Sequence, residues 1–509
     1  MVILTVRLRG TPPTTAIPGT RCLSTRVVGK GHDLQVFFLP SILFLSALPT
    51  NCQSPPYSTR RNKDEISSNC YEGFIYNRGL YSQSTIDIPQ MSTRAILPYD
   101  IIFQIIDTVG EDKDMVLLKE LALVSRSFHR ICCKHLFATV ELLVELDNPN
   151  PKRRRLFSKK SFVNILKSRP DVVKYIRKLT YEVSRYNDDD FRLSHILPKF
   201  LRTISLLNCL EISGSSLPWN SLKMDPSLTS ALLYLMHLPT INHIDLSQIR
   251  DFPLSILTPS VNLLRLDIRD VEPLEKEIVM EKMPKIREFR TTSSPLLTTK
   301  LLHAINQDGQ PVFNFMDLRR LSFCLGKGSE QNVRYLLQNT KLLEKLRLYT
   351  INPYQTFEGL HDTFPASAGS LKVLALSLAL YGSYNSTIHP PFKGLCELLE
   401  AMTGRNMLEA LTLEVKVYRY ETADDIGSRI QSVEKILVNP GWPALRQVSF
   451  KVPVSCCAPR KSTELVGELV VKLRILLPNK YLSHLSKLDS FAFDFSSYVF
   501  RPRFCKIHL

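Results

Sequence analysis

A short hydrophobic pattern recurs through residues 172–497. An apolar residue is followed three and five positions later by others, as in Leu342–Leu348 (LLEKLRL) and Met407–Leu413 (MLEALTL). Alternation of this kind is typical of a β-strand that buries one face. We expect the first strand near Ile176, Leu179 and Tyr181. The pattern then starts at Leu207, Ile241, Leu263, Ile286, Leu318, Leu343, Leu371, Leu408, Leu445 and Leu488.

Most intervals between these strands contain a segment with helical periodicity. Asp225-Pro226, for example, supplies a cap and a first-turn proline. The expected helices are Ser227–Leu238, Pro273–Met283, Leu297–Gln307, Ser329–Thr340, Gly394–Met402, Ile426–Val438 and Thr463–Leu477. A strand and helix that repeat in this way stack into a solenoid. We therefore predict an α/β fold with strands on the inner face and helices outside; a general α/β domain with a parallel sheet is the alternative.

A separate helical pattern occupies residues 94–145. Leu97-Pro98 is expected to be extended, because the residue before a proline avoids the α region. Apolar residues at helical spacing then predict three short helices. A module of this size buries little surface alone, so we expect a neighbour or partner to cover it.

This segment resembles an F-box. The resemblance is carried by Leu97-Pro98-Tyr99-Asp100, by Leu118–Phe128 (LKELALVSRSF) and by Cys132–Leu142 (CCKHLFATVEL). Phe128 stands where many members have tryptophan. The resemblance implies docking on a Skp-type adaptor of a cullin–RING ubiquitin ligase. The residues that would face the adaptor or support that face are Leu97, Pro98, Ile101, Ile102, Ile105, Leu121, Val124 and Phe128.

The strand–helix array in turn resembles the irregular leucine-rich repeats that follow F-boxes. The asparagine or cysteine that regular repeats carry eight positions after the first leucine is missing. The resemblance implies an irregular leucine-rich-repeat-like solenoid whose inner strand face binds a target protein. The candidate target-binding residues are Arg287, Arg290, Arg319, Arg320, Lys345 and Arg347. Their charge predicts an acidic or phosphorylated target, although ordinary solvated strand positions are the alternative.

Positive charge is concentrated in one segment. The formal charge is +17, and residues 151–180 hold eleven Lys and Arg against one acidic residue. We expect residues 146–171 to form a basic linker. Within it, Lys152, Arg153, Arg154 and Arg155 fit a nuclear import signal. Contact with nucleic acid is the remaining alternative.

The two ends of the chain lack sustained periodicity. We expect residues 1–93 to be a disordered or targeting extension and residues 498–509 to be a C-terminal tail. The first acid, Asp33, follows five basic residues, which is typical of a transit peptide. A secretory signal with residues 34–48 as its apolar region is a further alternative.

Motifs for chemistry are absent from the sequence. There is no P-loop, no H-E-x-x-H, no nucleophile elbow and no C-x-x-C, so we expect neither a catalytic site nor a metal or cofactor. The eleven cysteines are expected to be reduced, packed thiols. No apolar run reaches eighteen residues, so we expect no membrane span.

These features predict a non-catalytic, substrate-recognition subunit of a Skp–cullin–F-box ubiquitin ligase. Its expected partners are a Skp-type adaptor, the cullin core and an unidentified target protein, and its expected location is the cytoplasm, the nucleus or both. One alternative is a non-catalytic scaffold. Another is a nuclear protein that uses residues 151–180 to contact nucleic acid, which we do not favour because aromatic residues do not interleave the basic ones.

Overall fold

The computed structural model describes residues 4–8, 23–29, 32–38, 99–142, 156–183, 195–219, 226–274, 284–305, 309–326, 328–350, 355–366, 369–380, 392–404, 406–418, 422–455, 462–488 and 490–500. The chain divides into two compact units, Met1–Cys132 and Cys133–Leu509. The division falls inside a helix, earlier than the module boundary expected near residue 145. It does so because the last helix turns of the first module already belong to the second unit by their contacts.

The first unit begins with three strands where we expected a disordered or targeting extension. They are β1 (Leu4–Leu8), β2 (Leu23–Gly29) and β3 (His32–Phe38). β3 pairs antiparallel with both β1 and β2, in the order β1-β3-β2. The β-branched and aromatic residues of LSTRVVG and HDLQVFF favour strands, although no periodic pattern is sustained between them.

Three helices follow in residues 99–136. They are α1 (Tyr99–Glu111), α2 (Met115–Ala122) and α3 (Arg126–Leu136). The Asp114 carboxylate accepts hydrogen bonds from the amides of Val116 and Leu117 at 3.2 and 3.1 Å, and so caps α2. The Ser125 hydroxyl accepts from the Phe128 amide at 3.2 Å at the start of α3. Such caps satisfy amides that have no partner within the helix.

A single parallel sheet organises the second unit, which confirms the predicted α/β class. Among the described residues it has thirteen strands, whose order follows the chain from β6 to β16, with β4 and β5 beyond β6. All neighbouring strands in it run parallel. The strands are β4 (Thr139–Leu142), β5 (Leu156–Phe157), β6 (Lys178–Val183), β7 (Cys209–Pro218), β8 (His243–Phe252), β9 (Arg265–Pro273), β10 (Glu288–Thr292), β11 (Arg320–Leu325), β12 (Lys345–Thr350), β13 (Val373–Leu380), β14 (Ala410–Val417), β15 (Gln447–Ser455) and β16 (Ala492–Phe500).

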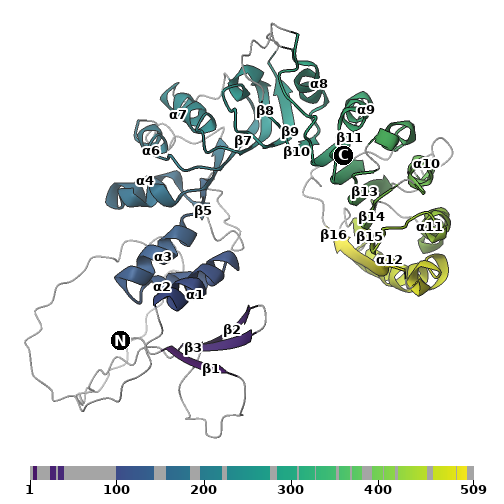
Figure 1. Ribbon diagram of the computed structural model, residues 1–509, viewed down its shortest axis with the longest axis horizontal. Coiled ribbons are helices and arrows are strands. Elements are labelled where there is room, and N and C mark those ends of the chain that lie inside the picture. The colour runs from purple at the N-terminus through teal and green to yellow at the C-terminus, as the bar shows by residue number, and fades with distance from the viewer. Residues whose placement is uncertain are drawn as a thin grey trace, which may run out of the picture. The chain divides into compact units, whose positions relative to one another are not determined.

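The helices of the second unit lie on one side of this sheet (Figure 1). They are α4 (Lys159–Ser168), α6 (Leu197–Leu201), α7 (Pro226–Met236), α8 (Pro295–His303), α9 (Glu330–Asn339), α10 (Lys393–Met402), α11 (Ala423–Val438) and α12 (Ser462–Leu476). Short helical turns complete the layer: η1 (Pro170–Tyr175), η2 (Leu254–Leu257), η3 (His361–Ala366), η4 (Leu477–Tyr481) and η5 (Leu485–Lys487). The helix expected over Pro273–Met283 falls largely outside the described residues.

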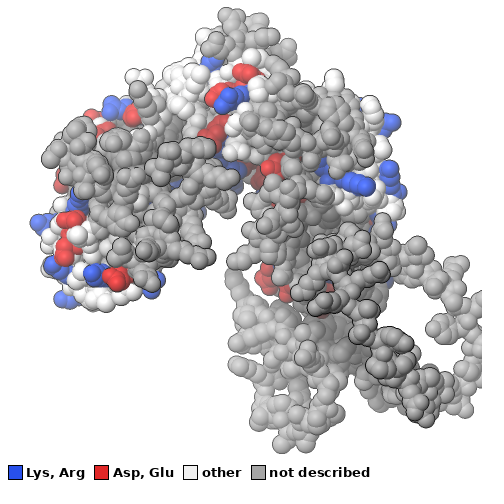
Figure 2. All heavy atoms as spheres, turned by 180° about the vertical axis from the view of Figure 1, so that it is seen from behind, with Lys and Arg blue, Asp and Glu red and all other residues white. Residues whose placement is uncertain are grey.

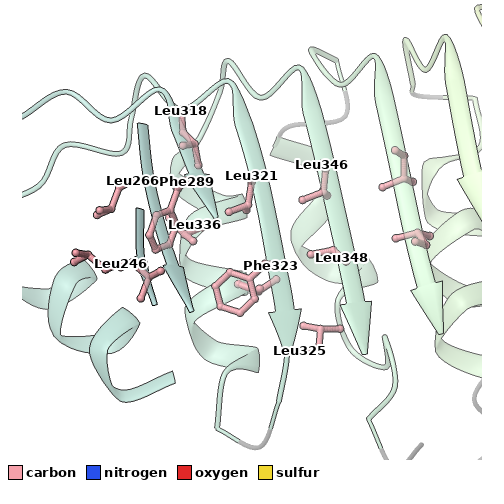
Figure 3. Packing of buried hydrophobic residues seen from close by; sticks show 14 of the residues in the cluster. Leu246, Leu266, Phe289, Leu318, Leu321, Phe323, Leu325, Leu336, Leu346 and Leu348 are labelled. Atoms are coloured by element: carbon pink, nitrogen blue, oxygen red, sulfur yellow. The ribbon is translucent and has the colours of Figure 1, made fainter. Parts of the chain in front are cut away.

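The core lies between the sheet and the helices. Leu318 of the recurring pattern is buried just before β11, and Leu321 and Phe323 point into the same layer from the strand (Figure 3). Leu346 of β12 and Leu336 of α9 belong to the same apolar cluster. Because side chains alternate along a strand, the residues between these leucines lie on the opposite face of the sheet. We call that strand face, away from the helices, the open face.

Part of the expected basic linker, residues 146–171, is folded into this layer. Phe162 and Leu166 of α4 are fully buried, and Lys159 is only 5% exposed. The Lys159 ammonium lies 4.7 Å from the centre of the Tyr181 ring, where the aromatic face stabilises its charge. At the other end, β16 continues to Phe500, beyond the end of the array expected at residue 497.

Candidate functional site

The helical unit carries large apolar side chains that face solvent. Leu123, just after α2, is 70% exposed, and Val116 within α2 is 52% exposed. Tyr99 and Phe103 are also exposed on α1, where their ring centres lie 5.1 Å apart. Exposed apolar residues of this size, close together in a short segment, are typical of a surface that another protein covers.

The residues expected to contact an adaptor divide into four groups. Ile101 and Val124 are exposed, whereas Ile102 and Ile105 are half-buried. Leu121 and Phe128 are buried, so their place is to support the helices. Leu97 and Pro98 lie outside the described residues. Sequence reasoning missed Tyr99, Phe103, Val116 and Leu123, which are apolar residues just off the main helical stripe.

The open face carries interleaved charges of both signs. The Glu288 carboxylate of β10 accepts a hydrogen bond from Arg320 of β11 at 2.8 Å and lies 3.6 Å from Arg265 of β9. Arg269 donates to Asp245 at 2.6 Å. Figure 2 likewise shows acidic and basic side chains next to each other on the described surface. The array therefore does not present one continuous positive field.

The six residues expected to bind a target occupy two kinds of position. Arg290, Arg320, Lys345 and Arg347 lie on β10, β11 and β12, at positions that alternate with the buried leucine and phenylalanine residues. Arg287 and Arg319 precede β10 and β11 instead. Arg319 donates to Glu344 at 3.2 Å. The strand register therefore brings four of the six together on the open face.

Three side chains lie next to one another across β7, β8 and β9, and the first two are hydrogen-bonded. The Cys209 sulfur lies 3.0 Å from Nδ1 of His243, and Nε2 of His243 lies 3.4 Å from Asp267. Burial raises the pKa of the Cys209 thiol to about 12, and the Glu211 carboxylate adds to the effect. The protonated thiol can thus donate to Nδ1. Although the three residue types suit nucleophilic catalysis, a thiol that resists ionisation is a poor nucleophile.

Alkylation tests this interpretation of Cys209. A pKa near 12 lowers the thiolate fraction of Cys209 about a thousandfold relative to a free cysteine. A thiolate of higher pKa is also a stronger nucleophile, which offsets part of the loss in reaction rate. We expect iodoacetamide at pH 7.5 to modify Cys209 roughly thirtyfold more slowly than a model peptide, measured by mass spectrometry of the folded chain. If Cys209 is modified faster than the cysteine of the peptide, it is an activated cysteine, and this result would contradict a purely structural role.

We also searched the described residues for a ligand cavity, a metal site and a membrane-spanning helix. A cavity of about 210 Å³ at the carboxyl ends of β10 and β11 is lined partly by apolar residues such as Phe323 and partly by hydroxyl groups, of which those of Thr291 and Thr298 are hydrogen-bonded at 3.0 Å. Among the described residues, no group of three His, Cys, Asp or Glu side chains could hold a metal ion. None of the described helices combines the length and apolar character needed to cross a membrane.

The basic segment is partly engaged in structure. Lys178 lies 2.5 Å from Glu211, and Arg169 lies 3.1 Å from Asp171. Lys152, Arg153, Arg154 and Arg155, the expected import signal, lie outside the described residues.

Comparison with known proteins adds no assignment. The sequence matches no protein-family model, and a search of curated proteins finds no similar sequence. Two surfaces of the molecule are therefore the candidates for function: the exposed apolar residues of the helical unit and the open face of the sheet.

Proposed function

We propose that this protein is the substrate-recognition subunit of a Skp–cullin–F-box ubiquitin ligase. In this proposal the helices α1–α3 form an F-box that binds a Skp-type adaptor, and the sheet unit is an irregular leucine-rich-repeat-like solenoid that binds the target. The protein performs no chemistry. It acts in the cytoplasm, the nucleus or both, by holding target lysines close to the charged conjugating enzyme and so raising their effective concentration.

The single observation that carries the proposal is the exposed apolar surface of the helical unit. Leu123 is 70% exposed although Leu118, five residues before it, is fully buried. A helical segment that has its own buried side and still exposes Tyr99, Val116 and Leu123 suits contact between an apolar surface and a partner groove. The F-box-like motif residues Ile101 and Val124 are exposed in the same segment.

The strand order supports the solenoid part of the proposal. Strands that follow one another in the chain are neighbours from β6 to β16, without the reversal that marks a doubly wound sheet. The described helices lie on one side of the sheet (Figure 1), and we assign the open face to a protein partner. Stacked strand–helix units of this kind use such an extended face for binding.

The two alternatives have less support. A nucleic-acid interface would need the basic residues of 151–180 to be free, yet Lys159 is buried and Lys178 is paired with Glu211. A scaffold that binds the adaptor without promoting transfer differs from the proposal only in its consequence for the target. The two can be separated by measuring ubiquitin transfer to a bound target with and without this chain. Transfer that requires the chain supports the proposal, and binding without transfer supports the scaffold.

Direct binding to a purified Skp-type adaptor tests the proposal. We expect the full chain to bind, and Leu123→Glu/Val124→Glu to weaken binding at least tenfold, because two exposed apolar contacts become charged. Isothermal titration gives both affinities. Ile475→Glu on α12 is the matched control, since Ile475 is 57% exposed in the other unit. Failure of the wild type to bind, or an equal loss with Ile475→Glu, would contradict an adaptor surface on α1–α3.

A further inference from the structure

One row across the open face combines two arginines with a serine between them. The strand register places Arg290 of β10 opposite Ser322 of β11, and Ser322 opposite Arg347 of β12. Neighbouring strands are about 4.8 Å apart, so the two arginine Cα atoms lie about 10 Å apart across the serine. Figure 3 shows the other side of these strands, where Phe289, Leu321 and Leu346 fill the core. The short serine side chain leaves space between two long ones.

Two donors in this row have no hydrogen-bond partner among the described residues. The Nε of Arg290 and the hydroxyl of Ser322 are shielded from solvent and make no hydrogen bond within the described part of the chain. Leaving a buried donor unpaired costs about 1–3 kcal/mol, and more for a charged group. The cost falls away if a ligand supplies acceptors. These two groups therefore point to an acceptor that binds between the arginines.

Arg347 is available on the other side of the serine. Its side chain is 53% exposed, and its nearest carboxylate, Glu414, is 3.9 Å away, beyond hydrogen-bond distance. The guanidinium carbon lies 6.0 Å from the centre of the Tyr349 ring, which helps to orient it. The carboxylate next to Arg290 in the row is Asp267, and it is already engaged by Arg265 at 2.8 Å.

We propose that Arg290, Ser322 and Arg347 bind the phosphate group of a phosphorylated serine or threonine in the target protein. The proposal rests on the target-binding part of the function proposed above. Two guanidinium groups and a hydroxyl offer donors from three directions and two positive charges. This matches a phosphate, with three terminal oxygens and a charge near −2, better than the two oxygens and single charge of a carboxylate.

The surroundings favour an isolated phosphate over a nucleic-acid backbone. On one side Glu288 and Asp267 are paired with Arg320 and Arg265, and on the other Glu414 lies 3.6 Å from Lys416. These carboxylates would repel the phosphates that follow at regular spacing along a nucleic-acid strand. A single phosphorylated residue on a polypeptide avoids them.

Titration of the full chain with short peptides tests the site. The probe is a blocked pentapeptide, Ala-Ala-phosphoserine-Ala-Ala, compared with the same peptide carrying glutamate or serine at the centre. We expect saturable binding of the phosphopeptide, with an affinity at least tenfold above that of the glutamate peptide. Arg290→Gln and Arg347→Gln should each weaken it at least tenfold, and Ser322→Ala about threefold. Equal binding of the phosphoserine and serine peptides would overturn the proposal.

Lys372→Gln is the matched control, because Lys372 precedes β13, is exposed and lies 3.8 Å from Glu409. This control should leave phosphopeptide binding unchanged. If it weakens binding as much as Arg290→Gln does, the effect comes from net charge alone, and the proposed site is wrong. Tighter binding of a ten-nucleotide thymidine strand, lost in Arg290→Gln, would assign the row to nucleic acid instead. Thermal unfolding must show that each variant is folded, and Arg347, half-exposed, provides a variant that leaves the core untouched.

Adaptor binding of Arg290→Gln/Arg347→Gln keeps this proposal separate from the ligase proposal. We expect the double variant to keep wild-type affinity for the adaptor while losing the phosphopeptide. Phosphopeptide binding without any adaptor binding would uphold the phosphate site and remove the ligase function. Adaptor binding with no preference for the phosphopeptide would support the ligase function and remove the phosphate site.

Discussion

Replacing Gly394 by alanine is expected to destabilise the second unit by about 2 kcal/mol or more. A Cβ at Gly394, near the start of α10, would lie 2.3 Å from the Glu358 amide nitrogen and 2.7 Å from the Phe357 carbonyl carbon. Both are backbone atoms, so no side chain can turn aside and α10 must move. Overpacking of this kind costs about 1–3 kcal/mol or more, which outweighs the gain of about 1 kcal/mol in helix propensity.

Gly467→Ala on α12 is the control with the opposite expected sign. A Cβ there meets no atom within 4 Å, so only the propensity gain applies and stability should rise by up to about 1 kcal/mol. Urea unfolding followed by the fluorescence of Trp219 and Trp442 measures both variants. If Gly394→Ala is as stable as the wild type, the close packing of α10 on the segment before η3 is not as described.

The Asp267→Asn substitution is expected to cost about 2.5 kcal/mol at neutral pH. Burial alone would raise the pKa of Asp267, but the close approach of His243 at 3.4 Å and the hydrogen bonds from Arg265 outweigh it and lower the pKa to about 2. Since an unfolded aspartate titrates near 3.9, the ionised group stabilises the fold above about pH 4. That contribution is lost as the pH falls from about 4 to 2. The difference in unfolding free energy between wild type and variant should shrink over the same range.

Asp245→Asn is the matched control on the neighbouring strand. Burial raises the pKa of Asp245 even though Arg269 donates to it, so its ionisation does not favour folding in the same way. We expect a smaller loss than with Asp267→Asn, and a pH dependence of the opposite sign. If the two variants lose the same stability and show the same pH profile, the surroundings described for Asp267 and Asp245 do not shift their pKa values in opposite directions.

The strands could be predicted from the sequence because the signal is local. Each of the ten pattern starts from Leu207 to Leu488 precedes one of the strands β7–β16. The apolar residue that opens the pattern packs just before its strand, and the next two alternate into the core, as Leu318, Leu321 and Phe323 do. Alternation and helical spacing are short-range properties that a single sequence contains.

Features that depend on charge or register could not be predicted in this way. The helix α4 is not recognisable in the sequence, because Lys and Arg residues surround Phe162 and Leu166 and give the segment the composition of a solvated linker. Arg319 and Arg320 are adjacent in sequence, yet only the second lies on β11, and a shift of one residue changes the face. The row Arg290–Ser322–Arg347 joins residues more than twenty positions apart in the chain, so only strand pairing brings it together.

The most direct test of the proposed function is affinity purification of the full chain from the cells in which it is expressed, with the bound proteins identified by mass spectrometry. The account predicts that the wild type recovers a Skp-type adaptor and a cullin, and that Leu123→Glu/Val124→Glu loses both while keeping the target proteins. Arg290→Gln/Arg347→Gln should keep the adaptor and lose targets that carry phosphate. Recovery of neither adaptor nor cullin by the wild type would contradict the assignment to a ubiquitin ligase.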